Sequence, residues 1–162
     1  MTSQKRRAPY FYVSFIKQEE LVVTNTFQVF TDKNIEPMEL ANLMASVSWG
    51  AENAYDSQAI RQSLSAYPFI AHCRESTGLL IGYVSAFSDG AFSTFVGELV
   101  VRPEFQRNGI GTQLLSLVVD RYSDIPVYAT PFEDTQEFFL ERGFRVPKCA
   151  MFVVSKRNAL PA

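Results

Sequence analysis

One turn in this chain combines the residue types that bind an anion. It runs from Gln106 to Gly111 and contains Arg107 and a further glycine, Gly109. The first N–H groups of a helix have no partner within that helix, and glycines let an anion approach them closely. Arg107 adds a full positive charge. The sequence therefore predicts a site for a phosphate or a diphosphate at this turn.

The elements on either side of the turn follow from the apolar pattern. Residues 96–101 are mostly apolar, and the strand they predict is closed by Pro103, which cannot donate to a sheet. After the turn, apolar residues recur at helical spacing, at Leu114, Leu115, Val118 and Tyr122. A strand, a glycine-bearing turn and a helix are thus expected in succession.

Two other nucleotide-binding motifs fit this turn poorly. A dinucleotide fingerprint needs a third glycine at position 114, where the chain has Leu114. A Walker loop ends in Gly-Lys-Ser/Thr, and no lysine lies between Lys33 and Lys148. The dinucleotide interpretation is weak, and the Walker interpretation fails.

The strand, turn and helix resemble the acetyl-CoA site of the GNAT N-acyltransferase superfamily, with Gln106, Gly109 and Gly111 at the three fixed positions of its motif. Residues 138–144, Phe-Phe-Leu-Glu-Arg-Gly-Phe, are similar to the family's Phe-Tyr-x-x-x-Gly-Phe segment. Shorter segments look like a branch with small-amine acetyltransferases: Ser48-Trp49-Gly50, Ile81-Gly82-Tyr83 and Ser88-Asp89-Gly90. The likeness extends over residues 27–155.

The resemblance implies acetyl-CoA as co-substrate and assigns residues to it. Main-chain groups of Leu99, Val100 and Val101 would pair with the pantetheine arm, and a nearby N–H would stabilise the oxyanion. The residues expected around the diphosphate are Gln106, Arg107, Asn108, Gly109, Ile110, Gly111 and Thr112. Phe138 and Phe139 would lie in the core or contact the cofactor.

Phe139 departs from the family, because many members have a tyrosine there that protonates the departing thiolate. Phenylalanine has no proton to give, so that role does not carry over to this chain. The coenzyme A thiol, with a pKa of about 8.5, leaves tolerably well without a dedicated acid. Tyr83 and Tyr128 are alternatives, although nothing in the sequence places their hydroxyl groups at the sulfur.

Glu98 is the residue we expect to act as the general base. A free amine with a pKa near 10 is protonated at neutral pH, so a base must remove a proton for the amine to attack a thioester. Glu98 is the one charge in an apolar strand, beside the segment expected to pair with pantetheine. The alternative is that Glu98 points to solvent or meets a basic side chain of a neighbouring strand.

Trp49 and Asp89 are the candidate acceptor-binding residues. Trp49, followed by acidic residues, falls where family members cover the acceptor, and an aromatic wall with carboxylates suits a cationic amine. Alternatively, Trp49 seals the helix packing and Asp89 belongs to a plain hairpin turn. We expect acetyl transfer to a small primary amine, with a peptide amine or a catalytically silent acyl-CoA-binding module as alternatives.

Composition predicts a single enzyme-sized domain over residues 8–162, preceded by a flexible basic tail at 1–7. A formal net charge of −2 argues against nucleic acid or an anionic membrane as a partner. Two cysteines give neither a disulfide framework nor a metal site, and Cys73 and His72 fit a packed strand. We expect a cytoplasmic location, because the first residues lack the small-residue cleavage site of a secretory signal.

The expected fold class is α/β, with a mixed, mostly antiparallel central sheet flanked by about four helices. Strands are predicted over residues 10–16, 21–30, 69–74, 79–87, 92–101, 127–129 and 151–154. Helices are predicted over residues 37–50, 56–67, 109–122 and 135–142. The extra N-terminal strands and the aromatic content are compatible with a homodimer formed through sheet edges.

Overall fold

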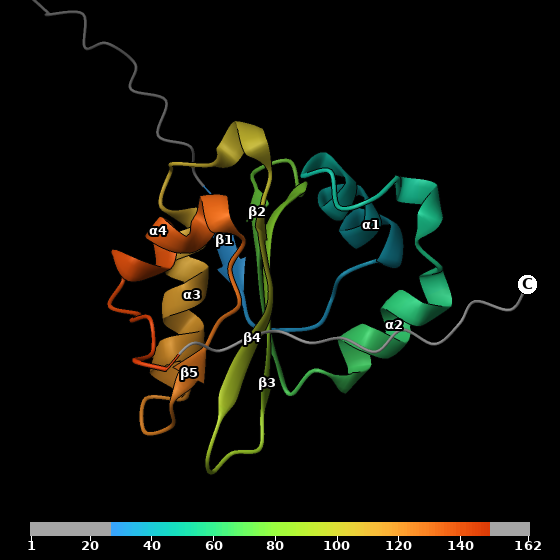
Figure 1. The fold of residues 1–162 in the computed structure, drawn as a ribbon. Helices are drawn as coiled ribbons and strands as arrows, with labels where there is room; N and C mark the ends of the chain where they lie inside the picture. The colour runs from blue at the N-terminus through green and yellow to red at the C-terminus, as the bar shows by residue number, and fades with distance from the viewer. Residues whose placement is uncertain (1–26, 150–162) are drawn as a thin grey trace, which may run out of the picture.

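The computed structural model describes residues 27–149, in which a five-stranded sheet lies between helices (Figure 1). Its strands are β1 Phe27–Phe30, β2 Phe69–Glu75, β3 Leu80–Ser88, β4 Thr94–Val101 and β5 Val127–Tyr128. The α-helices are α1 Pro37–Ser46, α2 Ser57–Ala66, α3 Ile110–Arg121 and α4 Gln136–Leu140. Short 3-10 turns are η1 Glu52–Ala54, η2 Pro103–Phe105 and η3 Glu133–Thr135.

The strands follow one another across the sheet in chain order, β1 to β5. Neighbours are antiparallel except β4 and β5, which are parallel, so the predicted mixed, mostly antiparallel sheet is confirmed. β5 pairs with β4 only at Thr94 and Phe95, although β4 continues to Val101. The later part of β4 therefore has an open edge on the side of β5.

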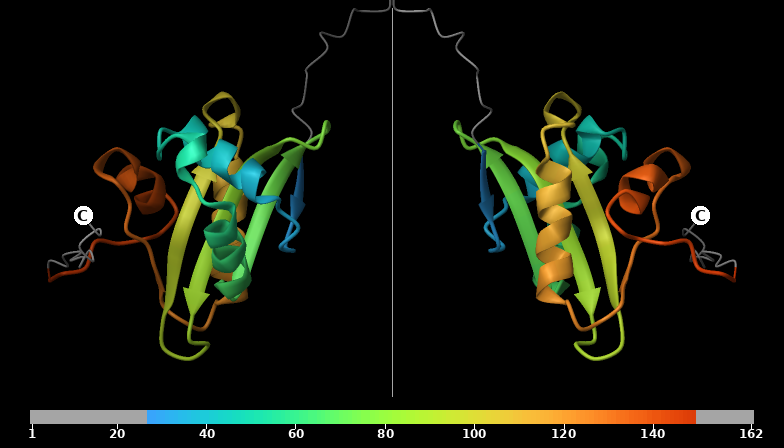
Figure 2. Two further views of the ribbon diagram at one scale, coloured as in Figure 1. Left: turned by 90° about the vertical axis from the view of Figure 1, so that its right-hand side faces the viewer. Right: turned by 90° about the vertical axis from the view of Figure 1, so that its left-hand side faces the viewer.

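Each face of the sheet packs against its own helices. α1 and α2 cover one face, where Leu43 and Leu64 meet Tyr83 and Val100. α3 covers the opposite face, and α4 lies beyond the β4 edge of the sheet (Figure 2). Gly82 of β3 lets α3 come close, because a Cβ there would lie 2.9 Å from Ile110 Cγ2.

Local signals explain where the helices begin and end. Asp56 caps α2 by accepting the Ala59 N–H at 2.8 Å, as its sequence position predicts. α2 stops before Pro68, which disfavours helical backbone in the residue that precedes it. The first helix ends at Ser46, earlier than predicted, because the chain turns through positive φ angles at Ser48 and Gly50.

Several predicted elements differ in extent or lie outside the described residues. The last helix is shorter than predicted, since residues 133–135 form a 3-10 turn and residues 141–143 a turn. The tail at 1–7 and the strands at 10–16 and 151–154 lie outside the described residues, as does most of the strand at 21–30. None of the helices within residues 27–149 is long and apolar enough to span a membrane.

Candidate active site

The turn before α3 presents a row of free backbone donors. Arg107 and Gly109 both have left-handed backbone, with φ angles of 63° and 80°. Within residues 27–149, none of the backbone N–H groups from Arg107 to Thr112 has a hydrogen-bond partner; the first helical bond runs from the Gln113 N–H to the Gly109 carbonyl. Such a row of N–H groups at a helix N-terminus is suited to an anion.

Two of the side chains predicted to bind the diphosphate donate hydrogen bonds to nearby main-chain carbonyls. The Gln106 amide donates to the Val101 carbonyl at 3.0 Å, and the Asn108 amide donates to the Phe105 carbonyl at 3.2 Å. Both bonds tie the turn to the end of β4 and to η2. Gln106 and Asn108 thus stabilise a conformation in which the N–H groups from Arg107 to Thr112 have no partner within residues 27–149.

The turn before α3 and the second sequence motif are in direct contact. A Cβ at Gly111 would lie 3.3 Å from Phe138 Cζ, so this glycine makes room for the aromatic ring. The Phe139 side chain is only 8% exposed and packs in the core between the rings of Phe138 and Phe144. Phe139 is thus a core residue, whereas half-buried Phe138 lies at the first turn of α3.

Arg142 is a residue of this site for which the sequence predicted no role. Its guanidinium Nε donates to Thr112 Oγ1 at 2.8 Å, and a second nitrogen donates to the Phe138 carbonyl. The guanidinium also lies 3.8 Å from the centre of the Phe138 ring. Arg142 therefore brings a second cation to the first turn of α3. The only sequence signal was a basic residue inside the second motif.

The open edge of β4 offers main-chain groups to a ligand. The Arg102 N–H bonds to the Ile81 carbonyl of β3, and in an antiparallel ladder such pairs alternate along the strand. By this alternation the main chain of Val100 faces β3, whereas the groups of Leu99 and Val101 face the open edge. Leu99 and Val101 are thus placed to pair with an extended ligand, and Val100 contributes its side chain to the core.

Glu98 lies in an irregular part of β4 and meets two hydroxyl groups. Between Val84 and Ala86 the register with β4 shifts, so that Gly97 and Glu98 both lie opposite Ser85. The Tyr67 hydroxyl donates to Glu98 Oε1 at 2.8 Å, and the Ser85 hydroxyl donates to Oε2. The half-buried carboxylate thus neither extends freely into solvent nor pairs with a basic side chain in the described residues.

Gly97 is the residue that lets these groups come together. A Cβ at this position would lie 2.5 Å from Ser85 Oγ and 2.9 Å from the Tyr67 hydroxyl oxygen. Burial, with a further contribution from the negative charge of Glu98, raises the pKa of Tyr67 to about 12. Burial, with a further contribution from the negative charge of Glu98, likewise raises the pKa of Tyr83. Both phenols therefore stay protonated at neutral pH.

Exposed aromatic rings continue from this carboxylate across the sheet. Phe87 of β3 lies opposite Phe95 of β4, which lies beside Tyr128 of β5. The Phe95 and Tyr128 rings stack with centroids 5.2 Å apart, and the Phe87 ring lies 4.2 Å from that of Tyr67. Because register partners share a face, the aromatic row of Phe87, Phe95 and Tyr128 borders the Glu98 site.

The two predicted acceptor residues have different surroundings. Trp49, half-buried, meets the exposed Phe132 ring with centroids 6.0 Å apart, so the connection after α1 touches the connection after β5. Asp89 accepts the N–H groups of residues 91–93 in its own hairpin turn, and these bonds lower the pKa of Asp89. Asp89 lies four residues beyond Ser85, roughly 13 Å along the strand, and is thus a turn residue.

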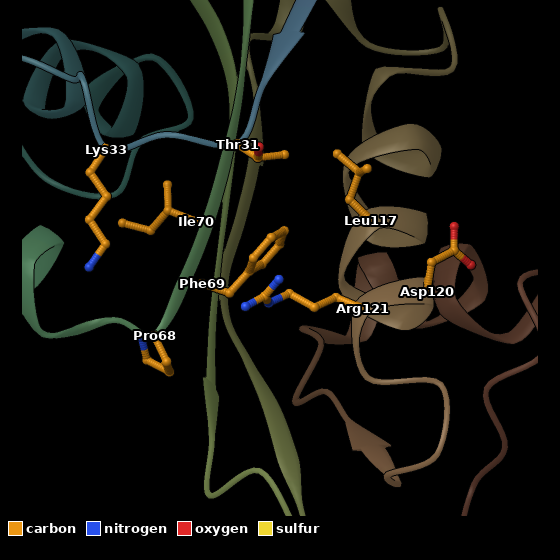
Figure 3. A pocket seen from close by; sticks show the side chains of 8 residues that line it. All are labelled: Thr31, Lys33, Pro68, Phe69, Ile70, Leu117, Asp120 and Arg121. Atoms are coloured by element: carbon orange, nitrogen blue, oxygen red, sulfur yellow. The ribbon is translucent and has the colours of Figure 1, made fainter.

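A pocket of about 490 Å³ lies elsewhere, at the far end of α3 (Figure 3). It is lined by Thr31, Lys33, Pro68, Phe69, Ile70, Leu117, Asp120 and Arg121. A helix of 12 residues is about 18 Å long, so this pocket is well separated from the turn before α3. None of the predicted site residues lines it.

His72 and Cys73 are packed strand residues, as predicted. His72 lies in β2, is 1% exposed, stacks on Phe30 and bonds to Asp32 at 3.1 Å. Cys73 is fully buried, and burial raises its pKa to about 11. Among residues 27–149, no group of histidine, cysteine and acidic side chains is arranged to hold a metal ion.

Comparison with known proteins agrees with the fold described for residues 27–149. Residues 35–144 match the sequence model of the Acetyltransferase (GNAT) family. The chain is 25% identical over 119 residues to the uncharacterized N-acetyltransferase ycf52 of Pyropia yezoensis, which covers 70% of this chain and 67% of that protein.

The fold is shared with solved structures of acetyltransferases. The GNAT family protein SP0256 from Streptococcus pneumoniae TIGR4 matches with a TM-score of 0.66 and 19% identity, over 82% of this chain and 100% of that one. The aminoglycoside N-acetyltransferase AAC(6')-Iy, solved in complex with CoA, matches with a TM-score of 0.61 and 14% identity, over 82% and 96% of the two chains. The family match covers more than half of the sequence, and the chain belongs to the GNAT family of acetyltransferases.

Proposed function

We propose that this protein transfers an acetyl group from acetyl-CoA to the primary amine of a small molecule. The observation that carries the proposal is the position of Glu98. Its carboxylate lies where β4 separates from β5, next to the main-chain groups of Leu99 on the open edge and next to the aromatic row. A thioester and an amine that meet at this point would have a carboxylate within reach.

The acetyl-CoA part of the proposal rests on the anion-binding turn. The free N–H groups from Arg107 to Thr112 would bind the diphosphate, with the guanidinium groups of Arg107 and Arg142 supplying charge-assisted contacts. The main chain of Leu99 and Val101 would pair with the pantetheine amides as an added strand does. AAC(6')-Iy, which has this fold, was solved with CoA.

In the proposed reaction Glu98 takes one proton from the ammonium form of the acceptor. The freed nitrogen lone pair then forms the C–N bond at the thioester carbon, and the C–S bond breaks as sulfur leaves with its electron pair. The second proton lost by the nitrogen goes to the thiolate or to water, and Glu98 returns its proton to water. The products are an N-acetyl amine, free thiol and one released proton.

Backbone donors would assist this reaction without a dedicated acid. The Leu99 N–H faces the open edge and would stabilise the negative oxygen that forms at the thioester carbonyl. Tyr83 is 1% exposed, and Tyr128 stacks on Phe95, so we assign neither hydroxyl to the sulfur. A thiol with a pKa of about 8.5 leaves as thiolate without prior protonation.

The acceptor site favours a small amine with an apolar body. The side chains of Phe87 and Phe95 are 48% and 46% exposed beside Glu98, and aromatic faces attract cations and flat apolar groups. Contact between Trp49 and Phe132 ties the connection after α1 to the connection after β5, and we infer that this closure leaves less room for a long peptide than for a small amine. A peptide or protein amine is the alternative, and screening both acceptor classes would separate them.

Thermal unfolding with and without acetyl-CoA tests the first half of the proposal. Ligand at about a hundred times its dissociation constant stabilises a protein by about 2.7 kcal/mol, which raises the Tm of a domain of this size by roughly 5–10 °C. An unchanged Tm at millimolar acetyl-CoA would refute the cofactor site.

Release of free thiol with a panel of amines tests the second half. We expect turnover with small amines, and we expect Glu98→Gln to lower kcat by roughly 100-fold or more while the Tm shift with acetyl-CoA persists. Binding without thiol release from any small amine or peptide would instead indicate a silent acyl-CoA-binding module.

A further inference from the structure

Two hydroxyl groups donate hydrogen bonds to the carboxylate of Glu98, one to each oxygen. Neither hydroxyl has a role in the proposed acetyl transfer. We propose that Tyr67 and Ser85 are positioning residues that hold the Glu98 carboxylate in the orientation needed to take the acceptor proton. This inference rests on the proposed function of Glu98. Tyr67 lies at the end of α2 and Ser85 in β3, so the two hydrogen bonds to Glu98 come from separate elements.

Tyr67 is itself held at three points. Its N–H bonds to the Ser63 carbonyl at 3.2 Å, and its own carbonyl accepts the Lys33 ammonium at 2.6 Å. Its ring lies 4.2 Å from the ring of Phe87 and is only 6% exposed. The main chain and the ring of Tyr67 are thus fixed by other contacts, and its hydroxyl donates to Glu98.

Ser85 fixes both the main chain and the side chain of Glu98. Its hydroxyl oxygen accepts the Glu98 N–H at 3.0 Å while its proton is donated to the carboxylate. In a regular antiparallel pair this N–H would bond to a main-chain carbonyl. The irregular pairing at Gly97 and Glu98 therefore places one residue of β3 in contact with both ends of Glu98.

The two hydrogen bonds leave the carboxylate able to accept a proton. Each carboxylate oxygen has about two lone-pair positions, so one on each remains for the acceptor ammonium. An unheld glutamate side chain would lose rotamer freedom on adopting one geometry, and the two hydroxyls impose that geometry before substrate arrives. The titratable groups that face the carboxylate in the described residues, Tyr67 and Tyr83, carry no charge at neutral pH.

The test is Tyr67→Phe, which keeps the ring and removes only the hydroxyl. We expect kcat for the amine to fall roughly tenfold or more, the size of one lost hydrogen bond to a charged group, with an unchanged KM for acetyl-CoA. Tyr122→Phe is the matched control, because the Tyr122 hydroxyl makes no hydrogen bond within residues 27–149 and lies at the other face of the sheet. An unchanged kcat in Tyr67→Phe overturns the proposal.

A double-mutant cycle with Glu98→Gln separates positioning from a structural effect. If Tyr67 acts through Glu98, Tyr67→Phe has little further effect in the Glu98→Gln background, whereas an independent structural effect persists there and overturns the proposal. Should Glu98→Gln alone keep full activity, the base assignment and this inference both fail. A large loss in Glu98→Gln beside a normal Tyr67→Phe refutes the inference alone. Ser85→Ala carries the same test if Tyr67→Phe does not fold.

Discussion

Replacing Gly97 with alanine would act on the site by geometry alone, because it removes no polar group. The added Cβ would lie 2.5 Å from Ser85 Oγ, where ordinary contacts begin at 3.4 Å, so one of the two groups must move by roughly 0.9 Å. The Tyr67 hydroxyl oxygen, 2.9 Å away, must also give way. Both hydroxyls that hold Glu98 are therefore displaced together.

The expected losses in stability and in activity are unequal. Overpacking of this kind costs about 1–3 kcal/mol, so a loss of about 2 kcal/mol should lower the Tm by roughly 4–8 °C. A displacement near 1 Å of a catalytic group can cost about 100-fold in rate. We expect Gly97→Ala to fold, to bind acetyl-CoA with unchanged affinity, and to turn over roughly 100-fold more slowly.

Three measurements on one preparation check this prediction. Thermal unfolding gives the stability, the Tm shift with acetyl-CoA gives cofactor binding, and thiol release gives kcat. A variant with the wild-type kcat would mean that the hydroxyls need not stay where they are, and the reasoning from Gly97 to Glu98 would be refuted. Weakened acetyl-CoA binding of the same size as the loss in kcat would place the damage at the open edge of β4 instead.

Further predictions concern the rest of the molecule. Arg142→Gln removes a cation beside Thr112 and should therefore weaken acetyl-CoA binding roughly tenfold, as measured by titration calorimetry. The KM of the amine, measured by thiol release, should change little. Burial lowers the pKa of His72, so the unfolded chain takes up a proton at higher pH than the folded chain. Stability should therefore fall as the pH drops below about 6.5, and His72→Asn should reduce this fall in urea unfolding. Gly82→Ala should cost about 1–3 kcal/mol by pushing α3 from the sheet, and an unchanged urea midpoint would contradict that packing.

The predictions about strand, turn and helix around Gly109 depended on local signals, and they were confirmed. Pro103 ends β4 before the turn, and the apolar spacing after Gly109 gives α3. The mixed sheet was also predictable, because a crossover helix between two strands makes them parallel. Helix ends were predicted less well, since the turn at Ser48 depends on a backbone angle that nothing in that local pattern indicates.

Among the site residues, the sequence indicated Glu98 but not what surrounds it. Tyr67 and Ser85 are distant from Glu98 in the chain, and their hydroxyl groups reach it only through the sheet register and the end of α2. Arg142 likewise lay in a recognised segment, but its bond to Thr112 appears only when α4 packs beside α3. Asp89 accepts N–H groups of its own turn, in agreement with the hairpin alternative, and a role toward the acceptor stays a prediction.

The sequence by itself determined the turn before α3 and the order of the elements, and it indicated Glu98 as the candidate base, because each depends on residues close together in the chain. Only the tertiary structure decided how the base is held and which main-chain groups stay free. Those features depend on the register between β3 and β4 and on the early end of β5. Strand register is set by packing over the whole sheet, and a shift of one residue would turn Glu98 to the opposite face.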